Sequence, residues 1–248
     1  MVNRSRRRSG LKVSADGRGV VSHVGARLLL DLADRVGLTD GLSVAMAPTK
    51  QRRRGHDRGR VLADVAAMIA GGGTTISDLA TLRDQPSLFG PVASKPTVWR
   101  TLEAVDGPVL ARIAVARAAA RRRVGAAGAD QGFYVIDFDA TLITAHSDKT
   151  GAAPTYKRGF GFHPLLAFLD GTGEALAGIL RPGNAGSNTA ADHVTVLAMA
   201  LAQLPAAPND VEVVARADPA GVTPRSIGPS ATPTLPFRVG HPPTDPYP

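Results

Sequence analysis

The chain has 248 residues, a formal net charge of +8 and no cysteine. This length holds one large domain or two modest ones, and the lack of cysteine excludes disulfides and thiolate metal sites. No stretch is apolar enough for a membrane span or a secretory leader, so the sequence predicts a soluble, cytoplasmic protein. Of the 29 basic residues 5 are lysine and 24 are arginine. Because guanidinium groups bind phosphate bidentately, this excess favours phosphate-bearing partners.

The first half of the chain is predicted to be helical. Residues 1–19 are basic and without hydrophobic period, and we interpret them as a flexible arm. Helices are predicted over 61–70, after a charged loop at 47–60, and over 108–124. A further helix is predicted over 20–36, because apolar residues recur there every four positions: Val24, Leu28, Leu32 and Val36.

Residues 75–105 have the pattern of two short helices joined by a turn. The first ends near Leu82, a turn with proline and glycine follows at 86–91, and the second opens at Pro96, a residue suited to a first helical turn. This order is typical of a helix-turn-helix, whose second helix reads DNA. An ordinary corner of a helical bundle is the alternative. The candidate DNA-contacting side chains are Lys95, Thr97, Trp99 and Arg100.

The hydrophobic period changes from helical to strand-like after a small-residue linker at 125–132, which we interpret as the domain boundary. Gly171-Thr172-Gly173 predicts a hairpin turn between two of the strands. The order is β-β-β-α-β, the opening of a ribonuclease-H-like fold, in which the first and fourth strands are neighbours. The predicted strands lie near 133–143, 163–170, 174–181 and 211–217, and the helix lies near 188–204.

Three aspartates lie on or just after two of these strands. Asp137 and Asp139 share one face of the strand 133–143, because strand side chains alternate, and Asp218 follows the strand 211–217. An unpaired carboxylate is costly to bury, so acids placed there bind a cation or a partner. If the two strands are neighbours, Asp139 and Asp218 meet and can hold Mg²⁺ or Mn²⁺ for phosphoryl transfer. Asp137 also has a structural interpretation, as a cap or as the partner of an arginine.

Several segments resemble DDE transposases of bacterial insertion sequences, and together they span roughly residues 15–221. The resemblance implies cut-and-paste transposition of double-stranded DNA at insertion-sequence terminal repeats. It also implies a nucleoid-associated location and leaves room for a homo-oligomer. The segments are Asp-Phe-Asp-Ala-Thr at 137–141, Tyr-Lys-Arg-Gly-Phe-Gly-Phe-His-Pro-Leu at 156–165, the turn at 183–188, Arg-Ala-Asp at 216–218, and the upstream blocks 83–90 and 94–102.

The resemblance implies a helical DNA-binding region over 20–124 and an α/β, ribonuclease-H-like catalytic core over 133–221 that uses Mg²⁺ or Mn²⁺. By the match Asp139 is the first catalytic acid and metal ligand and Asp218 is the second, with Asp137 as the alternative for the first position. The basic segment with Lys157, Arg158 and His163 would line the DNA path, although a solvated basic hairpin is the alternative. His193 is expected on the helix surface.

The family pattern also requires a third acid, a glutamate on a helix beyond the second aspartate. The glutamates of this chain are Glu103, Glu174 and Glu212, all of which precede that position. Residues 222–248 hold eight of the nineteen prolines, which disfavours a helix and most sheet pairing. We therefore expect a disordered tail that resembles a truncated or frame-shifted end, an incomplete core and no complete nuclease site. DNA binding through 1–124 would survive.

Two other functions stay open at this point. One is a DNA-binding regulator derived from a transposase, which would bind DNA without cleaving it. The other is a phosphatase of the haloacid-dehalogenase type, because residues 135–142 resemble the first motif of that family, with Asp137 as nucleophile and Asp139 as general acid and base. Against the phosphatase stand the missing later acidic pair and the consecutive strands, which do not alternate with helices.

Overall fold

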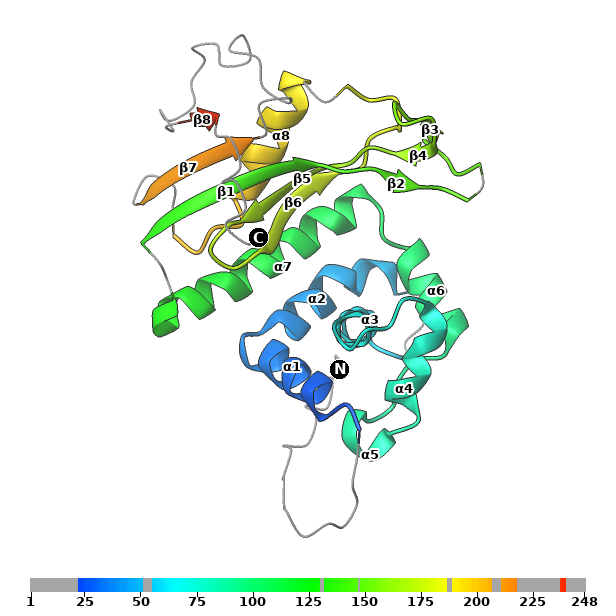
Figure 1. The fold of residues 1–248 in the computed structure, drawn as a ribbon. Coiled ribbons are helices and arrows are strands. Elements are labelled where there is room, and N and C mark those ends of the chain that lie inside the picture. Colours follow the sequence, from blue (N-terminus) through cyan, green and yellow to red (C-terminus); the bar gives the residue numbers. More distant parts are fainter. Residues whose placement is uncertain are drawn as a thin grey trace, which may run out of the picture. The chain divides into compact units, whose positions relative to one another are not determined.

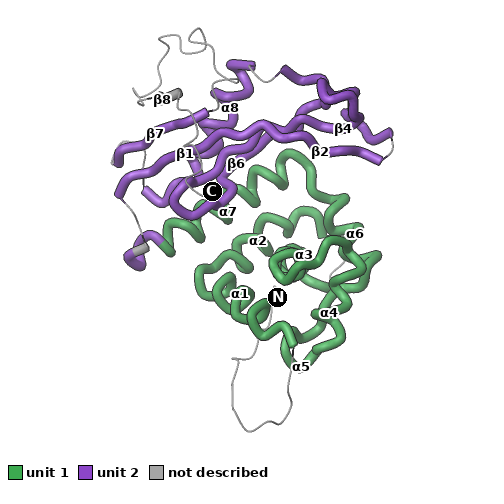
Figure 2. Tube along the Cα trace, viewed as in Figure 1, with its two compact units in different colours: residues 1–124 green, residues 125–248 purple. Residues whose placement is uncertain are grey.

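The chain divides into two compact units, unit 1 over 1–124 and unit 2 over 125–248 (Figure 2). None of the helices in the described parts is long and apolar enough to cross a membrane. The predicted arm, Asp218 and all of the predicted tail except 237–239 fall outside the described residues. The computed structural model describes residues 22–50, 55–129, 132–146, 148–186, 189–206, 211–217 and 237–239.

Unit 1 is helical in all its described elements (Figure 1). The helices expected over 20–36, 61–70 and 108–124 correspond to α1, α3 and α7, whereas α2 was not expected. A single apolar core holds the unit together, and its most deeply buried side chains include Leu30, Val61, Leu79, Phe89 and Val98. The elements are α1 (Val24–Arg35), α2 (Leu38–Met46), η1 (Ala47–Thr49), α3 (Arg58–Ala70), η2 (Ile76–Leu79), α4 (Ala80–Arg83), α5 (Pro86–Phe89), α6 (Lys95–Glu103) and α7 (Gly107–Val124).

The start of α3 is fixed by its neighbour α2. Asp57 caps α3, because its carboxylate accepts from the Arg60 N–H at 3.0 Å and also from the Ser43 hydroxyl at 2.7 Å. The backbones approach closely at this point: a Cβ on Gly59 would lie 2.1 Å from the backbone nitrogen of Ser43. The packing of α2 on α3 therefore depends on a glycine at position 59.

The predicted turn at 86–91 is wrong over its first four residues, which form α5. Pro86 occupies the first turn of this short helix, where its missing N–H costs nothing. Leu88 and Phe89 are buried in the core of unit 1, so hydrophobic packing favours the helical turn. The helix ends at Gly90, whose φ is +72°. The segment is thus a run of short helices before α6 rather than two helices and a turn.

Unit 2 contains a five-stranded sheet in the order β6-β5-β1-β7-β8. β1 is antiparallel to β5 and parallel to β7, so the predicted adjacency of the first and fourth main strands is confirmed. The hairpin at 171–173 is confirmed too: the Gly173 N–H donates to the Leu169 carbonyl at 2.7 Å. The sheet and its helix comprise β1 (Phe133–Ala140), β5 (Leu165–Leu169), β6 (Glu174–Ile179), α8 (Ala190–Leu201), β7 (Glu212–Ala217) and β8 (Phe237–Val239).

The core of unit 2 lies between the sheet and α8 (Figure 1). Tyr134, Ile136 and Phe138 point from β1 into this core, where they join Val196 and Ala200 of α8. Because strand side chains alternate, the odd-numbered residues of β1 face the other side of the sheet. The acids of β1 therefore lie on the face opposite α8.

Three features of unit 2 were not expected. A small sheet in the order β2-β4-β3 extends from the end of β1, built from β2 (Ile143–Thr144), β3 (Ala153–Pro154) and β4 (Phe160–Phe162). β8 lies within the predicted tail and pairs in parallel with β7. The predicted linker at 125–132 begins with a helical turn over 125–129 that follows α7 directly and contains Gly128 at a φ of +93°.

Candidate functional site

Asp139 lies near the end of β1, exposed, on the face opposite α8. Within the described part of the chain its carboxylate has no hydrogen bond or ion pair. A free carboxylate offers hard oxygen atoms, the ligand type that Mg²⁺ and Mn²⁺ prefer. Asp139 therefore fits the role of one cation ligand.

Asp137 lies two residues earlier on the same face, but its carboxylate is occupied. Arg216 of β7 donates from Nε to Oδ1 at 2.6 Å and from Nη2 to Oδ2 at 2.7 Å. The same Nη2 also donates to Asp170 at 2.7 Å, and Asp170 directly follows β5. The hydrogen bonds that Arg216 donates to Asp137, helped by the one to Asp170, raise the pKa of the Arg216 guanidinium, so this group stays charged.

We call Arg216, Asp137 and Asp170 the Arg216 clamp, because it links the neighbouring strands β7, β1 and β5. Both oxygens of Asp137 accept bonds from one guanidinium, which leaves this residue poorly suited to bind a cation. In the structure Asp137 therefore has an arginine partner, Arg216, as its structural interpretation requires. Asp170 was missed by the sequence analysis, since nothing in its local sequence connects it to an arginine 46 residues away.

The register of β1 and β7 places Asp139 one residue beyond the last pair of the ladder. The parallel ladder pairs Asp137 with Arg216 and Phe138 with Ala217. Asp139 follows Phe138 in β1, whereas Asp218, the residue after Ala217 in the sequence, lies outside the described residues. Over the part of the chain that the structure describes, no three His, Asp or Glu side chains gather into a group that could hold a metal ion.

The loop between β6 and α8 is held by a buried arginine. Arg181, 4% exposed, donates from Nε to the His163 carbonyl at 2.9 Å and from Nη1 to the Gly186 carbonyl at 3.0 Å. It also forms an ion pair with Asp192 of α8 at 3.2 Å. His163 is itself buried, and its Nδ1 donates to the Ala185 carbonyl at 2.9 Å. The hypothesis that His163 lines a DNA path is wrong, because its side chain is buried and hydrogen-bonded to the Ala185 carbonyl of this loop.

Two glycines in the transposase-like segments are required by close backbone contacts. A Cβ on Gly161 would lie 2.0 Å from the Ile143 carbonyl oxygen, and one on Gly183 would lie 2.3 Å from the Ala153 oxygen. Gly161 is the middle residue of β4, with β2 and β3 paired on either side of it. Pro182 adds a bridge to Phe162. These segments therefore build the small sheet and the loop beside it.

Lys157 and Arg158 are exposed on the turn between β3 and β4. The turn borders a groove of about 440 Å³ whose other wall is the chain that leaves β1, residues 140–144. Asp139 immediately precedes that wall in the sequence. His193, which was expected on the helix surface, is half-buried in α8, with its ring centroid 5.7 Å from that of Phe138.

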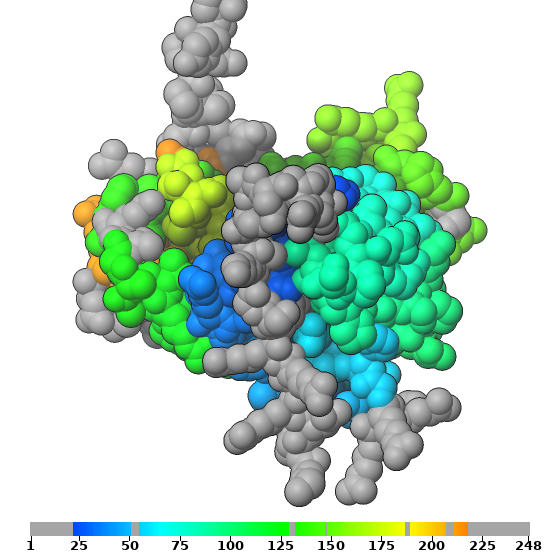
Figure 3. Space-filling model, turned by 90° about the horizontal axis from the view of Figure 1, so that it is seen from below, coloured from blue at the N-terminus to red at the C-terminus, as the bar shows by residue number. Residues whose placement is uncertain are grey.

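In unit 1, α6 presents three of the four predicted DNA-contacting side chains to solvent. Lys95 and Arg100 are exposed, and Trp99 is 63% exposed although it is a large aromatic side chain. Thr97 is half-buried, and its hydroxyl accepts from the Arg100 guanidinium at 3.4 Å. The segment from η2 to α6 forms a continuous teal-to-green part of the surface in the space-filling view (Figure 3). Val98 and Thr101 are buried and fix which face α6 turns outward.

Several arginines of unit 1 serve the fold. Arg112 of α7 donates to the Ala45 carbonyl at the end of α2 at 3.0 Å, and Arg123 donates to the Val36 carbonyl at the end of α1 at 2.6 Å. Arg27 of α1 is buried, pairs with Asp31 and donates to the Leu88 carbonyl. Cations at helix C-termini are favourable. Part of the basic excess is therefore structural.

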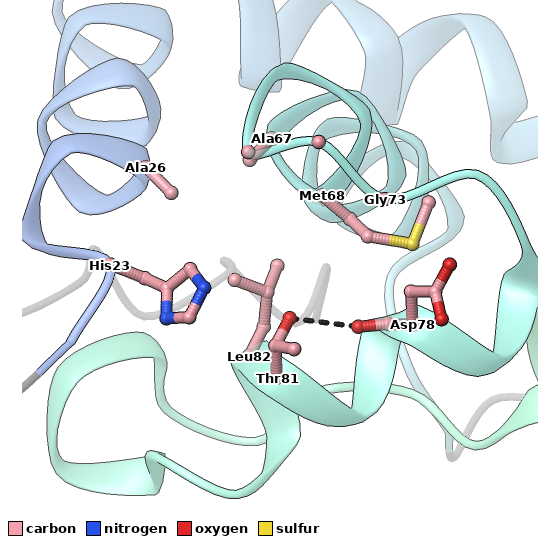
Figure 4. A pocket seen from close by; sticks show the side chains of 10 residues that line it. His23, Ala26, Ala67, Met68, Gly73, Asp78, Thr81 and Leu82 are labelled. Atoms are coloured by element: carbon pink, nitrogen blue, oxygen red, sulfur yellow. Dashed lines mark hydrogen bonds between the residues drawn. The ribbon is translucent and has the colours of Figure 1, made fainter.

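A small pocket in unit 1 lies between the start of α1, the end of α3 and the η2–α4 segment, with a volume of about 190 Å³ (Figure 4). Its acid, Asp78, accepts from the backbone N–H groups of Thr75 at 2.8 Å and Thr74 at 2.9 Å. These backbone hydrogen bonds lower the pKa of the Asp78 carboxyl. Asp78 thus fixes a helix start, and we assign the pocket no chemistry.

Comparison with known proteins connects this geometry to one family. A family model described as transposase DDE domain group 1 matches residues 3–240, almost the whole chain. No curated protein and no solved structure matches it. The resemblance to DDE transposases is thereby confirmed. The match, the consecutive antiparallel strands β1, β5 and β6 and the occupied carboxylate of Asp137 together argue against the phosphatase.

Proposed function

The chain belongs to the transposase DDE domain group 1 family, and on this premise we propose that unit 2 is a ribonuclease-H-like core built for metal-dependent strand transfer at insertion-sequence ends. The sheet order supports this fold, because β1 lies between the antiparallel β5 and the parallel β7. β8 continues the sheet on the far side of β7. The core was predicted to stop at residue 221, so β8 adds one strand to the predicted sheet.

Asp139 is the first acid of the proposed site. The observation that carries the proposal is its carboxylate, which has no partner among the described residues and lies one residue beyond the last pair of the β1–β7 ladder. In the sequence, Asp218 directly follows β7. Asp139 and Asp218 would hold Mg²⁺ or Mn²⁺, and such a cation activates a water or a 3′-hydroxyl and stabilises the leaving oxygen. Asp137 would not bind it, because Arg216 holds both of its oxygens.

Neither glutamate of unit 2 lies beside Asp139 in the described sheet. Glu212 begins β7 opposite Phe133, six residues from Asp139 along β1, or roughly 20 Å at 3.3 Å per residue. Glu174 begins β6, whereas the β6 residue level with Asp139 through Leu166 is Gly178. Glu103 lies on α6 in unit 1. We propose that this chain binds the DNA ends and that the glutamates of unit 2 do not supply a third acid for cleavage, so that a DNA-binding regulator is the second candidate function.

DNA binding is proposed for the exposed face of α6. Lys95 and Arg100 would contact phosphate, and Trp99 would pack against the groove or the sugars, as residues near the start of a recognition helix do. A double-stranded DNA partner also agrees with the net charge of +8. A homo-oligomer and a nucleoid-associated location remain part of the proposal by family likeness.

The proposal is tested by measuring the affinity of the full chain for insertion-end duplex DNA as the salt concentration rises. Arg100→Ala should lower the slope of log affinity against log salt by about 1, the value for one lost phosphate contact. Arg35→Ala, which removes an exposed arginine at the end of α1, serves as the control and should leave the slope unchanged. The same chain with Mg²⁺ should not nick the DNA. A chain that binds no duplex DNA, or an Arg100→Ala slope equal to that of the wild type, would refute the proposal.

A further inference from the structure

A groove lies beside the end of β1, and an exposed tyrosine is among its lining residues. We call it the Tyr156 groove; its volume of about 440 Å³ lies in the range of a small-ligand site. One wall is the chain leaving β1 and the other is the turn between β3 and β4. It is lined by Ala140, Thr141, Leu142, Ile143, Thr144, Thr155, Tyr156, Lys157, Gly159 and Phe160.

Tyr156 is the aromatic side chain of this groove that reaches furthest into solvent. It is 69% exposed, an unusual fraction for a large aromatic side chain. Its ring centroid is 5.8 Å from the ring of the buried His163, and the Lys157 ammonium lies 5.8 Å from the Tyr156 ring centroid. The ring thus lies beside a buried histidine and a cation, and most of its surface is exposed to solvent.

The turn that carries Tyr156 is held by its own hydrogen bonds. The Thr155 N–H donates to the Gly159 carbonyl at 2.8 Å, and the Arg158 N–H donates to the Thr155 carbonyl at 3.0 Å. The Thr155 hydroxyl accepts from the Gly159 N–H at 3.1 Å. Arg158 adopts a φ of +62°, which closes the turn. The backbone that carries Tyr156 and Lys157 is therefore held in place before a ligand binds.

We propose that the Tyr156 groove holds one unpaired nucleotide of a DNA strand, with the base stacked on Tyr156 and a phosphate near Lys157. Aromatic rings beside basic groups are the usual platform for unpaired bases, because every base has a π-face and none is accessible inside a duplex. The exposed hydroxyls of Thr141 and Thr144 supply donors for the sugar-phosphate. The inference rests on the proposed function, since the nucleotide belongs to the DNA strand that would reach Asp139.

The test compares two DNA probes bound to the full chain by fluorescence anisotropy. One is a blunt duplex and the other is the same duplex with a three-thymidine 3′ overhang. Stacking of one base is worth roughly tenfold in affinity, so the wild type should prefer the overhang by about that factor. Tyr156→Ala should abolish the preference, so that the two probes bind about equally well. Tyr156→Phe keeps the ring and should retain the preference. Trp99→Ala should weaken binding of both probes equally.

The outcomes separate the two proposals. If duplex binding is normal but the overhang is not preferred, or if the preference survives in Tyr156→Ala, the groove assignment is overturned and the proposed function stands. If neither probe binds, the proposed function fails and the groove assignment fails with it. A competition with thymidine 5′-monophosphate distinguishes a site for free nucleotides from a site for a DNA strand. If the mononucleotide displaces the overhang probe when both are at the same concentration, the assignment to a DNA strand is overturned.

Discussion

Arg216 holds both carboxylate oxygens of Asp137 across the β1–β7 ladder, at 2.6 and 2.7 Å. This bidentate pair distinguishes two aspartates that the sequence places on the same face of the same strand. Asp137 is neutralised by a fixed cation, whereas Asp139, two residues further, keeps its carboxylate free within the described structure. The proposed division of roles between the two acids rests on that contact.

Removal of the Arg216 clamp should destabilise unit 2 modestly. In Arg216→Ala the carboxylates of Asp137 and Asp170 lose their shared cation and repel each other. The three side chains are 33 to 50% exposed, so solvent screens the interaction and the free energy of unfolding should fall by about 1 kcal/mol. Urea unfolding of the full chain measures the change. Asp170→Asn in the Arg216→Ala background should recover part of the loss; an unchanged midpoint in Arg216→Ala would mean that the clamp does not stabilise the sheet.

Gly161→Ala should disrupt the small sheet, because a Cβ would lie 2.0 Å from the Ile143 carbonyl oxygen and neither backbone has room to move between β2 and β3. Overpacking of this kind costs about 1–3 kcal/mol, and thermal unfolding should show a lower midpoint. Gly107→Ala is the matched control, because a Cβ there meets nothing within 4 Å. Equal midpoints for the two variants would contradict the close contact.

Asp78→Ala should lower the stability of unit 1 in a pH-dependent way. Backbone hydrogen bonds lower the pKa of Asp78 below its ordinary value of 3.8, so the folded state prefers the charged carboxylate. The stabilisation is therefore fully present above pH 3.8 and is lost as the pH falls through the folded-state pKa. The difference in unfolding midpoint between the wild type and the variant should be constant from pH 7 to 5 and shrink in more acidic buffer. A difference that grows on acidification would have the wrong sign.

The main elements were predictable from sequence where the hydrophobic period was long. The strand at 133–140, the helix at 190–201 and their order have strong patterns, and the adjacency of β1 and β7 followed from that order. The strands of the small sheet have only two or three residues each, too few to show a period of two. β8 lies in a proline-rich segment, so its sequence does not predict a strand. α2 contains Gly41, and α5 has only four residues, so neither resembles an ordinary helix.

The sequence names candidate acids for the site but not the side chains that contact them. Asp137 and Arg216 are 79 residues apart, and only the parallel register brings them together. His163 lies among basic residues in the sequence yet is buried, because Arg181 and the Ala185 carbonyl bind it. The arginines of unit 1 illustrate the same point, since the charge pattern does not separate those that contact helix ends from those on the surface.

The most direct test of the account is a Mn²⁺ titration of the full chain and of its aspartate variants by calorimetry. Asp139→Asn and Asp218→Asn should each weaken Mn²⁺ binding at least about tenfold, because each removes a hard oxygen ligand. Asp137→Asn should change it by less than about twofold, because that carboxylate is held by Arg216. The control is Asp40→Asn, an exposed acid of α2. A loss of Mn²⁺ affinity in Asp137→Asn with none in Asp139→Asn would contradict the assignment of Asp139 as the first acid of the site.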